Sequence, residues 1–164
     1  MAQLVDPKHE WAGEIGRIVI AFGNIEHITM LCLNQLPNDP IYPATSHLNL
    51  APRLELLVAV LRGSTDIAAE KLGQLLTEAK ALAEERNLVV HNPLVLDVYQ
   101  DSDGGYKFEH TIQSLRRVEK RLALRDLESI RERAERLATD LYEVASPMLE
   151  RRYRAVTGSG DIEA

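Results

Sequence analysis

The sequence predicts a mainly α-helical protein: an up-down bundle of four to five helices, with a small β-hairpin inserted between the third helix and the last long helix. Two observations predict this fold class. In three long segments, apolar residues recur at alternating steps of three and four, which places them on one face of a helix. In a shorter segment, apolar residues alternate at every second position, which is typical of strands. Long helices with matching apolar faces favour a bundle.

Length and composition indicate one domain. With 164 residues, 45% of them hydrophobic, the chain is long enough for one real core and short for two. We therefore expect a single helical domain over residues 1–156 and a disordered tail over residues 157–164, where small and polar residues predominate. Because the sequence has neither eighteen consecutive apolar residues nor a signal-peptide pattern, we expect a cytoplasmic protein without a membrane span.

The first predicted helix follows Asp6 and Pro7, which suit the cap and the first turn of a helix. Its apolar face is formed by residues at heptad spacing, namely Ile15, Ile18, Phe22, Ile25, Thr29, Cys32 and Leu36. Three prolines between positions 37 and 43 end this helix and predict a loop.

Two further helices are predicted before the hairpin. A short one begins near residue 51 and is ended by Gly63, because glycine commonly follows the last helical residue. The third predicted helix runs from about Asp66 to His91, and Ser64 or Thr65 can cap it.

The hairpin and the last helix complete the predicted fold. Strand-like alternation covers residues 94–112, interrupted by a turn at residues 101–105 that is rich in Asp and Gly. Residues 113–124 fit neither pattern. The last helix is predicted from about residue 125, with a bend at Pro147.

The charge distribution does not indicate a general polyanion binder, because the formal net charge is -6. Basic residues outnumber acidic ones between Arg116 and Arg136, and we interpret this run as a solvated helix face with internal ion pairs. The single cysteine, Cys32, excludes an internal disulfide and a cysteine-based zinc site. The histidines show no ligand spacing, so we expect neither a metal nor a cofactor.

The segment over residues 85–93 carries the candidate site. Arg86 falls on the apolar face of the third helix, where a charged side chain needs either a partner or a function. Asn87 and His91 are four residues apart and are therefore neighbours on one helical face, while a proline follows Asn92 and ends the helix. The sequence thus places a cation, an amide and a titratable ring at one helix end.

Glu26 is a further candidate, as a supporting residue together with Asn92. It interrupts the most apolar part of the first helix, where an isolated carboxylate would be costly to bury. We therefore expect Glu26 to pair with an arginine, either Arg86 or Arg53.

This combination resembles the HEPN family (higher eukaryote and prokaryote nucleotide-binding), many of whose members are metal-independent ribonucleases. The resemblance rests on Arg86, Asn87 and His91 near the end of the third helix of a helical domain. It implies that Arg86 and His91 are catalytic, that Asn87 supports them, and that two chains form a composite site on a two-fold homodimer. Relatives controlled by nucleotidyltransferase antitoxins carry a tyrosine two residues after the histidine, but this chain has Pro93 there, so we do not expect that route of control.

The chemistry of RNA cleavage agrees with these residue types. Attack of a ribose 2′-hydroxyl on its own phosphate needs a base, an acid and positive charge on the phosphoryl oxygens. Histidine, with an ordinary pKa of about 6.5, can act as base or acid, and the guanidinium fork of arginine matches a phosphate. We therefore expect an endoribonuclease that acts on RNA, with the toxin of a toxin-antitoxin or phage-defence system as its setting and a cognate antitoxin protein as a partner.

Two other functions remain open. One is a non-catalytic helical module that dimerises and binds a protein or a nucleotide, with residues 86–91 serving only for packing. The other is an acidic antitoxin or immunity protein that binds a basic partner, which the net charge of -6 favours.

Overall fold

The computed structural model describes residues 9–37, 41–45 and 47–158, and it confirms a mainly helical fold with a small sheet before the last helix. Its five helices are α1 (His9–Gln35), α2 (Tyr42–Thr45), α3 (Leu50–Leu61), α4 (Ile67–Val90) and α5 (Leu124–Thr157). The three long helices α1, α4 and α5 form the bundle, and the shorter α3 packs against α4. The single turn α2 lies within the segment that the prolines predicted to be a loop.

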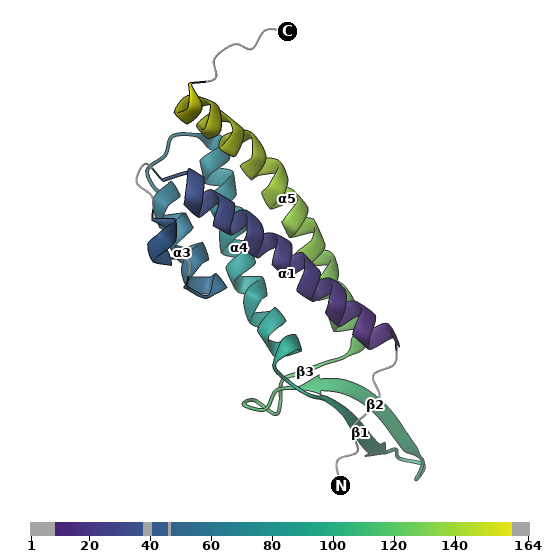
Figure 1. Cartoon of the computed structure of the whole chain (residues 1–164). Coiled ribbons are helices and arrows are strands. Elements are labelled where there is room, and N and C mark those ends of the chain that lie inside the picture. Colours follow the sequence, from purple (N-terminus) through teal and green to yellow (C-terminus); the bar gives the residue numbers. More distant parts are fainter. Residues whose placement is uncertain (1–8, 38–40, 46, 159–164) are drawn as a thin grey trace.

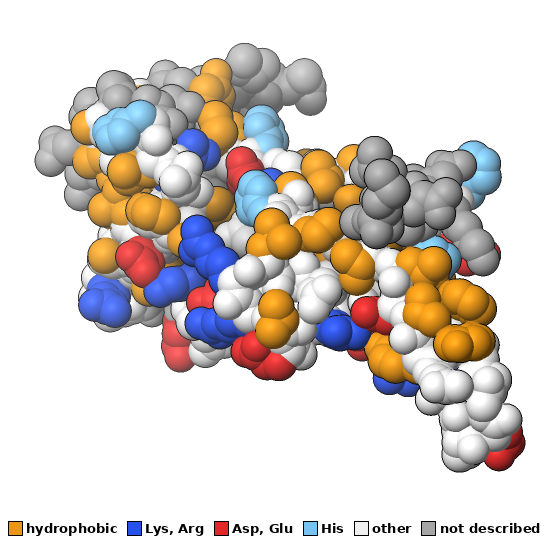
Figure 2. Space-filling model, turned by 90° about the horizontal axis from the view of Figure 1, so that it is seen from below, with side chains coloured by type: hydrophobic (Ala, Val, Ile, Leu, Met, Phe, Trp, Pro, Cys, Tyr) orange, Lys and Arg blue, Asp and Glu red, His pale blue; other side chains and the backbone are white. Residues whose placement is uncertain are grey.

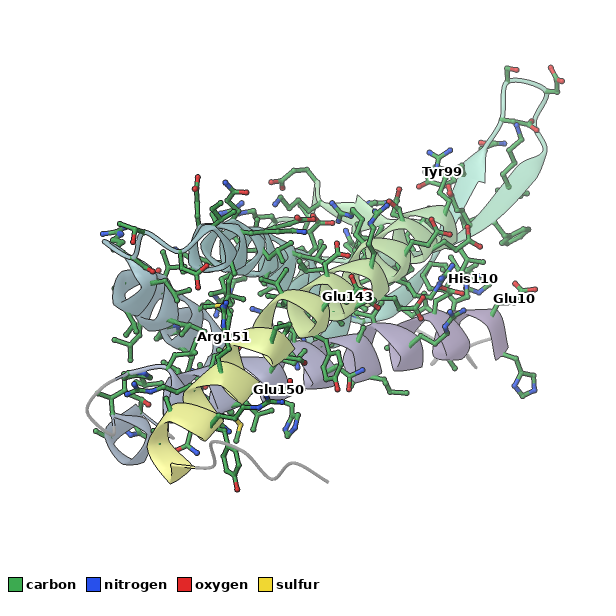
Figure 3. The ribbon with its side chains drawn as sticks, turned by 90° about the horizontal axis from the view of Figure 1, so that it is seen from above. Glu10, Tyr99, His110, Glu143, Glu150 and Arg151 are labelled. Carbon is green, nitrogen blue, oxygen red and sulfur yellow. The ribbon has the colours of Figure 1, made fainter. Side chains whose placement is uncertain are left out.

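The three long helices lie side by side, and α4 runs opposite to α1 and α5 (Figure 1). The sheet therefore lies at the end of the bundle where α4 ends and α5 begins. At the opposite end, Arg151 of α5 forms an ion pair of 3.0 Å with Asp66, the residue that precedes α4. Figure 3 shows Arg151 and the sheet residue Tyr99 far apart along the molecule. The candidate residues at the end of α4 thus lie beside the sheet.

The sheet is antiparallel and has three strands in the order β1 (Leu94–Gln100), β2 (Tyr106–Gln113) and β3 (Arg121–Leu122). β1 and β2 form the predicted hairpin, and the unassigned residues 113–124 supply the third strand and the turn before it. In the hairpin turn, Asp101 Oδ1 accepts a hydrogen bond of 2.7 Å from the backbone N–H of Gly105. Gly104 has a φ of 81°, a conformation that favours glycine.

The core lies where the apolar faces of the long helices meet. Its largest fully buried side chains come from α1, α3, α4, α5 and the base of β2, and include Phe22, Ile25, Leu54, Leu57, Leu76, Ile112, Ile130 and Leu137. The spacing of three and four therefore identified the packed faces correctly. Ile112 of β2 is also 1% exposed, so the base of the hairpin is anchored in the same core.

Helix ends differ from the sequence-based prediction in two places. The cap of α4 is Asp66, whose Oδ1 accepts a hydrogen bond of 2.9 Å from Ala68, and neither Ser64 nor Thr65 takes that role. Helix α5 continues through Pro147 to Thr157, the first residue of the predicted tail. The predicted start at Asp6 and residues 159–164 of the predicted tail lie outside the described residues.

Helix α1 is the one helix of the described residues that is long and apolar enough to span a membrane. By length and composition it could do so, with a mean hydropathy of 1.3 over an eighteen-residue window. In this structure, however, its apolar residues pack against α5, α3 and α4. One such helix is weak evidence for a membrane span, because the core helix of a soluble protein meets the same criteria.

Ion pairs hold the surfaces of α1, α4 and α5 together. Arg131 of α5 donates to Glu14 of α1 over 2.6 Å and to Glu135 over 3.0 Å. The hydrogen bond to Glu14 is the main cause that raises the pKa of Arg131 above its ordinary value. In the same run, Arg133 pairs with Glu85 of α4. The interpretation of the basic run as an ion-paired helix face is therefore correct for Arg131 and Arg133.

Cys32 should be unreactive in the native protein. Its side chain is fully buried, and this burial raises the pKa of the thiol from 9.0 to about 12, so very little nucleophilic thiolate forms near neutrality. A thiol reagent should label Cys32 only as fast as the fold opens, and should label one thiol per chain at once in denaturant. The matched control is Ser129→Cys, which adds an exposed thiol on α5 and should react immediately. Equally fast labelling of native wild type would contradict the buried position.

Candidate functional site

Helix α4 ends at the candidate histidine. The backbone N–H of His91 donates to the carbonyl oxygen of Asn87 over 3.1 Å, which closes the last helical turn. Pro93 lacks an N–H and disfavours a helical conformation for the residue before it, so the chain leaves the helix and enters β1. The imidazole of His91 is left exposed at this junction.

Asn92 connects the helix end to the loop that follows the hairpin. Its Nδ2 donates to the carbonyl oxygen of Leu88 over 2.8 Å, and its Oδ1 accepts from the backbone N–H of Leu115 over 2.8 Å. One amide thus satisfies a carbonyl at the end of α4 and fixes a segment more than twenty residues away in the sequence. Asn92, predicted as a supporting residue, therefore has a structural role.

The segment over residues 114–120, here called the basic loop, is held by its own hydrogen bonds. Ser114 Oγ accepts from the backbone N–H groups of Arg116 and Arg117, over 3.3 Å and 3.1 Å. The backbone N–H of Ser114 donates to Lys120 O over 3.0 Å, and that of Lys120 donates to Arg117 O over 2.8 Å. The side-chain amide of Gln113 donates to Val118 O over 3.2 Å. The basic loop is therefore a defined turn.

An open groove of about 770 Å³ lies between the end of α4 and the basic loop. Asn87, His91 and Asn92 line it from the helix side, and Arg116, Arg117 and Lys120 line it from the loop side. Its volume lies within the range of roughly 300–1,000 Å³ that is typical of ligand sites in proteins. The groove brings together three of the predicted site residues and three cations that the sequence analysis did not select.

The electrostatics of the groove favour an anion on the loop side. Arg116, Arg117 and Lys120 are exposed, and within the described ranges none of them forms an ion pair. On the helix side, Glu85 is neutralised by its ion pair with Arg133, which leaves the exposed Glu84 as the other acidic lining residue. The groove therefore has a basic wall and a weakly acidic wall.

Arg86 does not line this groove with His91. Its Cζ lies 6.0 Å from the centre of the Phe22 ring, a cation-π distance, and its Nε is buried with no hydrogen-bond partner in the described part of the chain. Its Nη1 donates to Asn87 Oδ1 over 3.1 Å. Arg86 thus lies on the apolar side of α4, as its spacing predicted, and contacts the groove only through Asn87.

Glu26 does not have the partner that the sequence predicted. It is half-buried on α1, and across residues 9–37, 41–45 and 47–158 the structure records no ion pair or hydrogen bond between Glu26 and Arg86 or Arg53. The expected pairing with Arg86 is not formed, because the side chain of Arg86 is directed to Phe22 and Asn87. Glu26 is not among the residues that line the groove.

The basic loop was missed because its charges were assigned to the following helix. Arg116, Arg117 and Lys120 precede α5 and lie in a turn, so the helical i,i+4 partners that neutralise Arg131 do not exist for them. The available signal was their position, in the segment that fitted neither helix nor strand periodicity. Basic residues in such a connection cannot form the regular pairs of a helix face.

Replacing Asn92 with alanine should detach the basic loop from α4. The change removes two hydrogen bonds of 2.8 Å, and we expect it to lower the free energy of unfolding by about 1–2 kcal/mol. Hydrogen exchange at the Leu115 amide should accelerate, because that N–H loses its acceptor. The control is Asn34→Ala on the exposed face of α1, which should change neither quantity. Unchanged exchange at Leu115 in Asn92→Ala would show that the contact does not hold the loop.

Neither a metal-binding cluster in the described residues nor a similar protein indicates what the groove binds. In the part of the chain that the structure describes, no group of three or more His, Cys, Asp and Glu side chains is arranged to hold a metal ion. Comparison of the chain with protein-family models, curated proteins and solved structures found no match.

Proposed function

We propose that this protein is a metal-independent endoribonuclease of the HEPN type, which cleaves RNA by attack of a 2′-hydroxyl on the adjacent phosphate. The observation that carries the proposal is the groove in which His91 and Asn87 face Arg116, Arg117 and Lys120. It offers an exposed proton-transfer group, an amide and positive charge in one place. These are the groups that this reaction requires.

His91 is the proton-transfer residue in this proposal. Its ring is exposed in the groove, and in the described structure no side-chain hydrogen bond occupies it, so both ring nitrogens can reach a substrate. The Asn87 amide lies one helical turn before the ring. Because Arg86 donates to Asn87 Oδ1, the Asn87 side chain is oriented with its NH₂ group available for a phosphoryl oxygen. Arg86 then contributes positive charge behind that amide and fixes its orientation.

One groove contains one such histidine, whereas cleavage needs both a base and an acid. We therefore propose a two-fold homodimer that brings His91 and Asn87 of both chains to one composite cleft, with Arg86 behind each Asn87 amide. Sedimentation velocity at micromolar concentration should show a dimer. A strictly monomeric protein that still cleaves RNA would contradict the composite site.

The reaction itself can be tested with labelled RNA in the presence of EDTA. Cleavage should persist in chelator and leave a 2′,3′-cyclic phosphate, because the attacking group is the neighbouring 2′-hydroxyl. A substrate with a single 2′-deoxyribose at the cut position should resist cleavage there, and DNA should remain intact. A requirement for a divalent metal, or equal cleavage at the deoxy position, would overturn the mechanism.

The proposed setting is cytoplasmic, as the toxin of a toxin-antitoxin or phage-defence system with a cognate antitoxin protein. Such a protein binds RNA despite a net charge of -6, and the basic wall of the groove supplies the local positive potential that this requires. Induction in cells should therefore arrest growth in the wild type and not in a variant without His91.

A second candidate, an interaction module, is favoured by a separate feature. Large apolar side chains on one face of the hairpin are 43–66% exposed, namely Leu96, Val98, Tyr106 and Phe108. Figure 2 shows hydrophobic side chains gathered on this projecting part. An exposed apolar face of this kind is typical of protein-interaction sites. Absence of ribonuclease activity at all metal concentrations would make this the better assignment.

A further inference from the structure

We infer that the basic loop, residues 114–120, is a binding site for the phosphate backbone of a single RNA strand, and that it lays this strand across His91. The inference rests on the proposed function and deepens it, because it states how the substrate is held. The binding residues are Arg116, Arg117 and Lys120, none of which belongs to the motif that suggested ribonuclease chemistry.

Three neighbouring cations have acidic partners among the described residues, whereas the three cations of the basic loop do not. Arg121 pairs with Asp97 over 2.7 Å, Arg131 with Glu14 over 2.6 Å, and Arg133 with Glu85. In the same part of the sequence, the described structure gives the three cations of the basic loop no acidic partner. Figure 2, which views the molecule from the sheet end, shows most Lys and Arg side chains on the side away from the projecting hairpin, with acidic side chains among them. Three cations without an acidic partner in the described part of the chain thus line one wall of the same groove.

The backbone of the basic loop is ordered before any ligand binds. Its backbone is fixed by hydrogen bonds to Ser114 Oγ, to the backbone of Lys120 and to the side chain of Gln113. The loop needs little further ordering to bind, so less binding free energy is lost to conformational entropy. These hydrogen bonds fix the backbone positions from which the three cationic side chains extend.

Asn92 aligns the basic loop with His91. Asn92 follows His91 in the chain and accepts the N–H of Leu115, the residue before Arg116. The same amide thus sets both the end of the catalytic helix and the start of the basic loop. A phosphate backbone that contacts the loop must therefore pass beside the imidazole, with the scissile phosphate displaced toward α4.

The α4 wall of the groove favours a single strand over a duplex. Glu84 is exposed on the α4 side of the groove, and a second row of phosphates would lie against this carboxylate. Leu88 and the exposed Leu115 also line the groove and offer apolar surface to unpaired bases. Because the loop contacts phosphates and not base edges, it should hold strands of any sequence.

The experiment measures binding without cleavage. A fluorescent single-stranded oligonucleotide with 2′-O-methyl groups throughout cannot be cut, and its affinity is measured at several salt concentrations. The test variant is R116A/R117A/K120A, and the matched control is R62A/K71A/R136A, which removes three exposed cations that do not line the groove. Because each phosphate contact on a single strand contributes about 0.7 to the salt dependence, the test variant should lose a slope of about 2, and the control should lose little.

Each result supports or contradicts phosphate binding by the basic loop. The charge-preserving variant R116K/R117K/K120R should keep most of the affinity, which separates loss of charge from loss of folding. Equal weakening in the test and control variants, or equal affinity for a duplex of the same sequence, would overturn the inference. If wild type never cleaves RNA but the test variant alone loses binding, the proposed ribonuclease function fails and the strand-binding site stands.

Discussion

Replacing His91 with alanine should abolish measurable RNA cleavage and leave the protein folded. Proton transfer by a positioned side chain contributes roughly 10²–10⁴-fold to a rate, and no other histidine lines the groove of the described structure. The imidazole is exposed at the end of α4, so its removal takes nothing from the core. The measurement is initial rate on labelled RNA in EDTA, alongside thermal unfolding of the same preparation.

The matched control is His27→Ala, which removes an exposed histidine of α1 that lines a different groove. This variant should cleave at the wild-type rate. In the wild type, the rate should rise and then fall with pH, because one ring of the dimer must be neutral while the other is protonated. Arg86→Lys should also be strongly impaired, since a point charge cannot hold Asn87 as the planar guanidinium does. Undiminished cleavage by His91→Ala would remove the basis of the ribonuclease proposal.

Replacing Phe22 with alanine should have the largest effect on stability, about 3–5 kcal/mol in the free energy of unfolding. The Phe22 ring is fully buried in the middle of α1, and Arg86 lies over it with Cζ 6.0 Å from its centre. The substitution therefore leaves a cavity in the core and removes the surface on which the guanidinium rests. Denaturant unfolding monitored by circular dichroism measures the change.

The control for this prediction is Phe108→Ala, the same substitution at a ring that is 66% exposed on β2. Little core volume is lost there, so the change should stay within about 0.5 kcal/mol. Phe22→Leu should be milder than Phe22→Ala, because it retains apolar volume but loses the cation-π contact with Arg86. Equal stability losses at positions 22 and 108 would show that Phe22 is not part of the packed core.

The fold could be predicted because helical periodicity reports directly on burial. The residues at steps of three and four on α1, α4 and α5 are the ones that pack, and the hairpin turn at residues 101–105 has the Asp and Gly chemistry that such turns need. The cap of α4 was misplaced by one or two residues, because Ser64, Thr65 and Asp66 are all suitable caps. The pairing of β3 depends on contacts distant in sequence, which periodicity does not report.

Only the α4 side of the candidate site was predicted from the sequence. Spacing correctly placed Asn87 and His91 on a shared face, because residues four apart are neighbours in any helix. Spacing could not show that Arg86 turns to Phe22 on another helix, nor that Asn92 receives a hydrogen bond from Leu115. These contacts depend on tertiary packing, which helical spacing does not report. The expected pairing of Glu26 with Arg86 failed for the same reason.

The two walls of the groove are joined through the hairpin, and the pairing of its strands therefore fixes the width of the groove. Leu94 lies opposite Ile112 at the base of β1 and β2, just beyond Asn92 on one side and just before Ser114 on the other. A slip of one residue in this register would turn the faces over and carry the basic loop away from α4. The distal turn at residues 101–105 has no such constraint, since it projects beyond the bundle (Figure 1). Insertions at that tip can lengthen the hairpin and leave the groove unchanged, whereas an insertion of a single residue at its base would dismantle the groove.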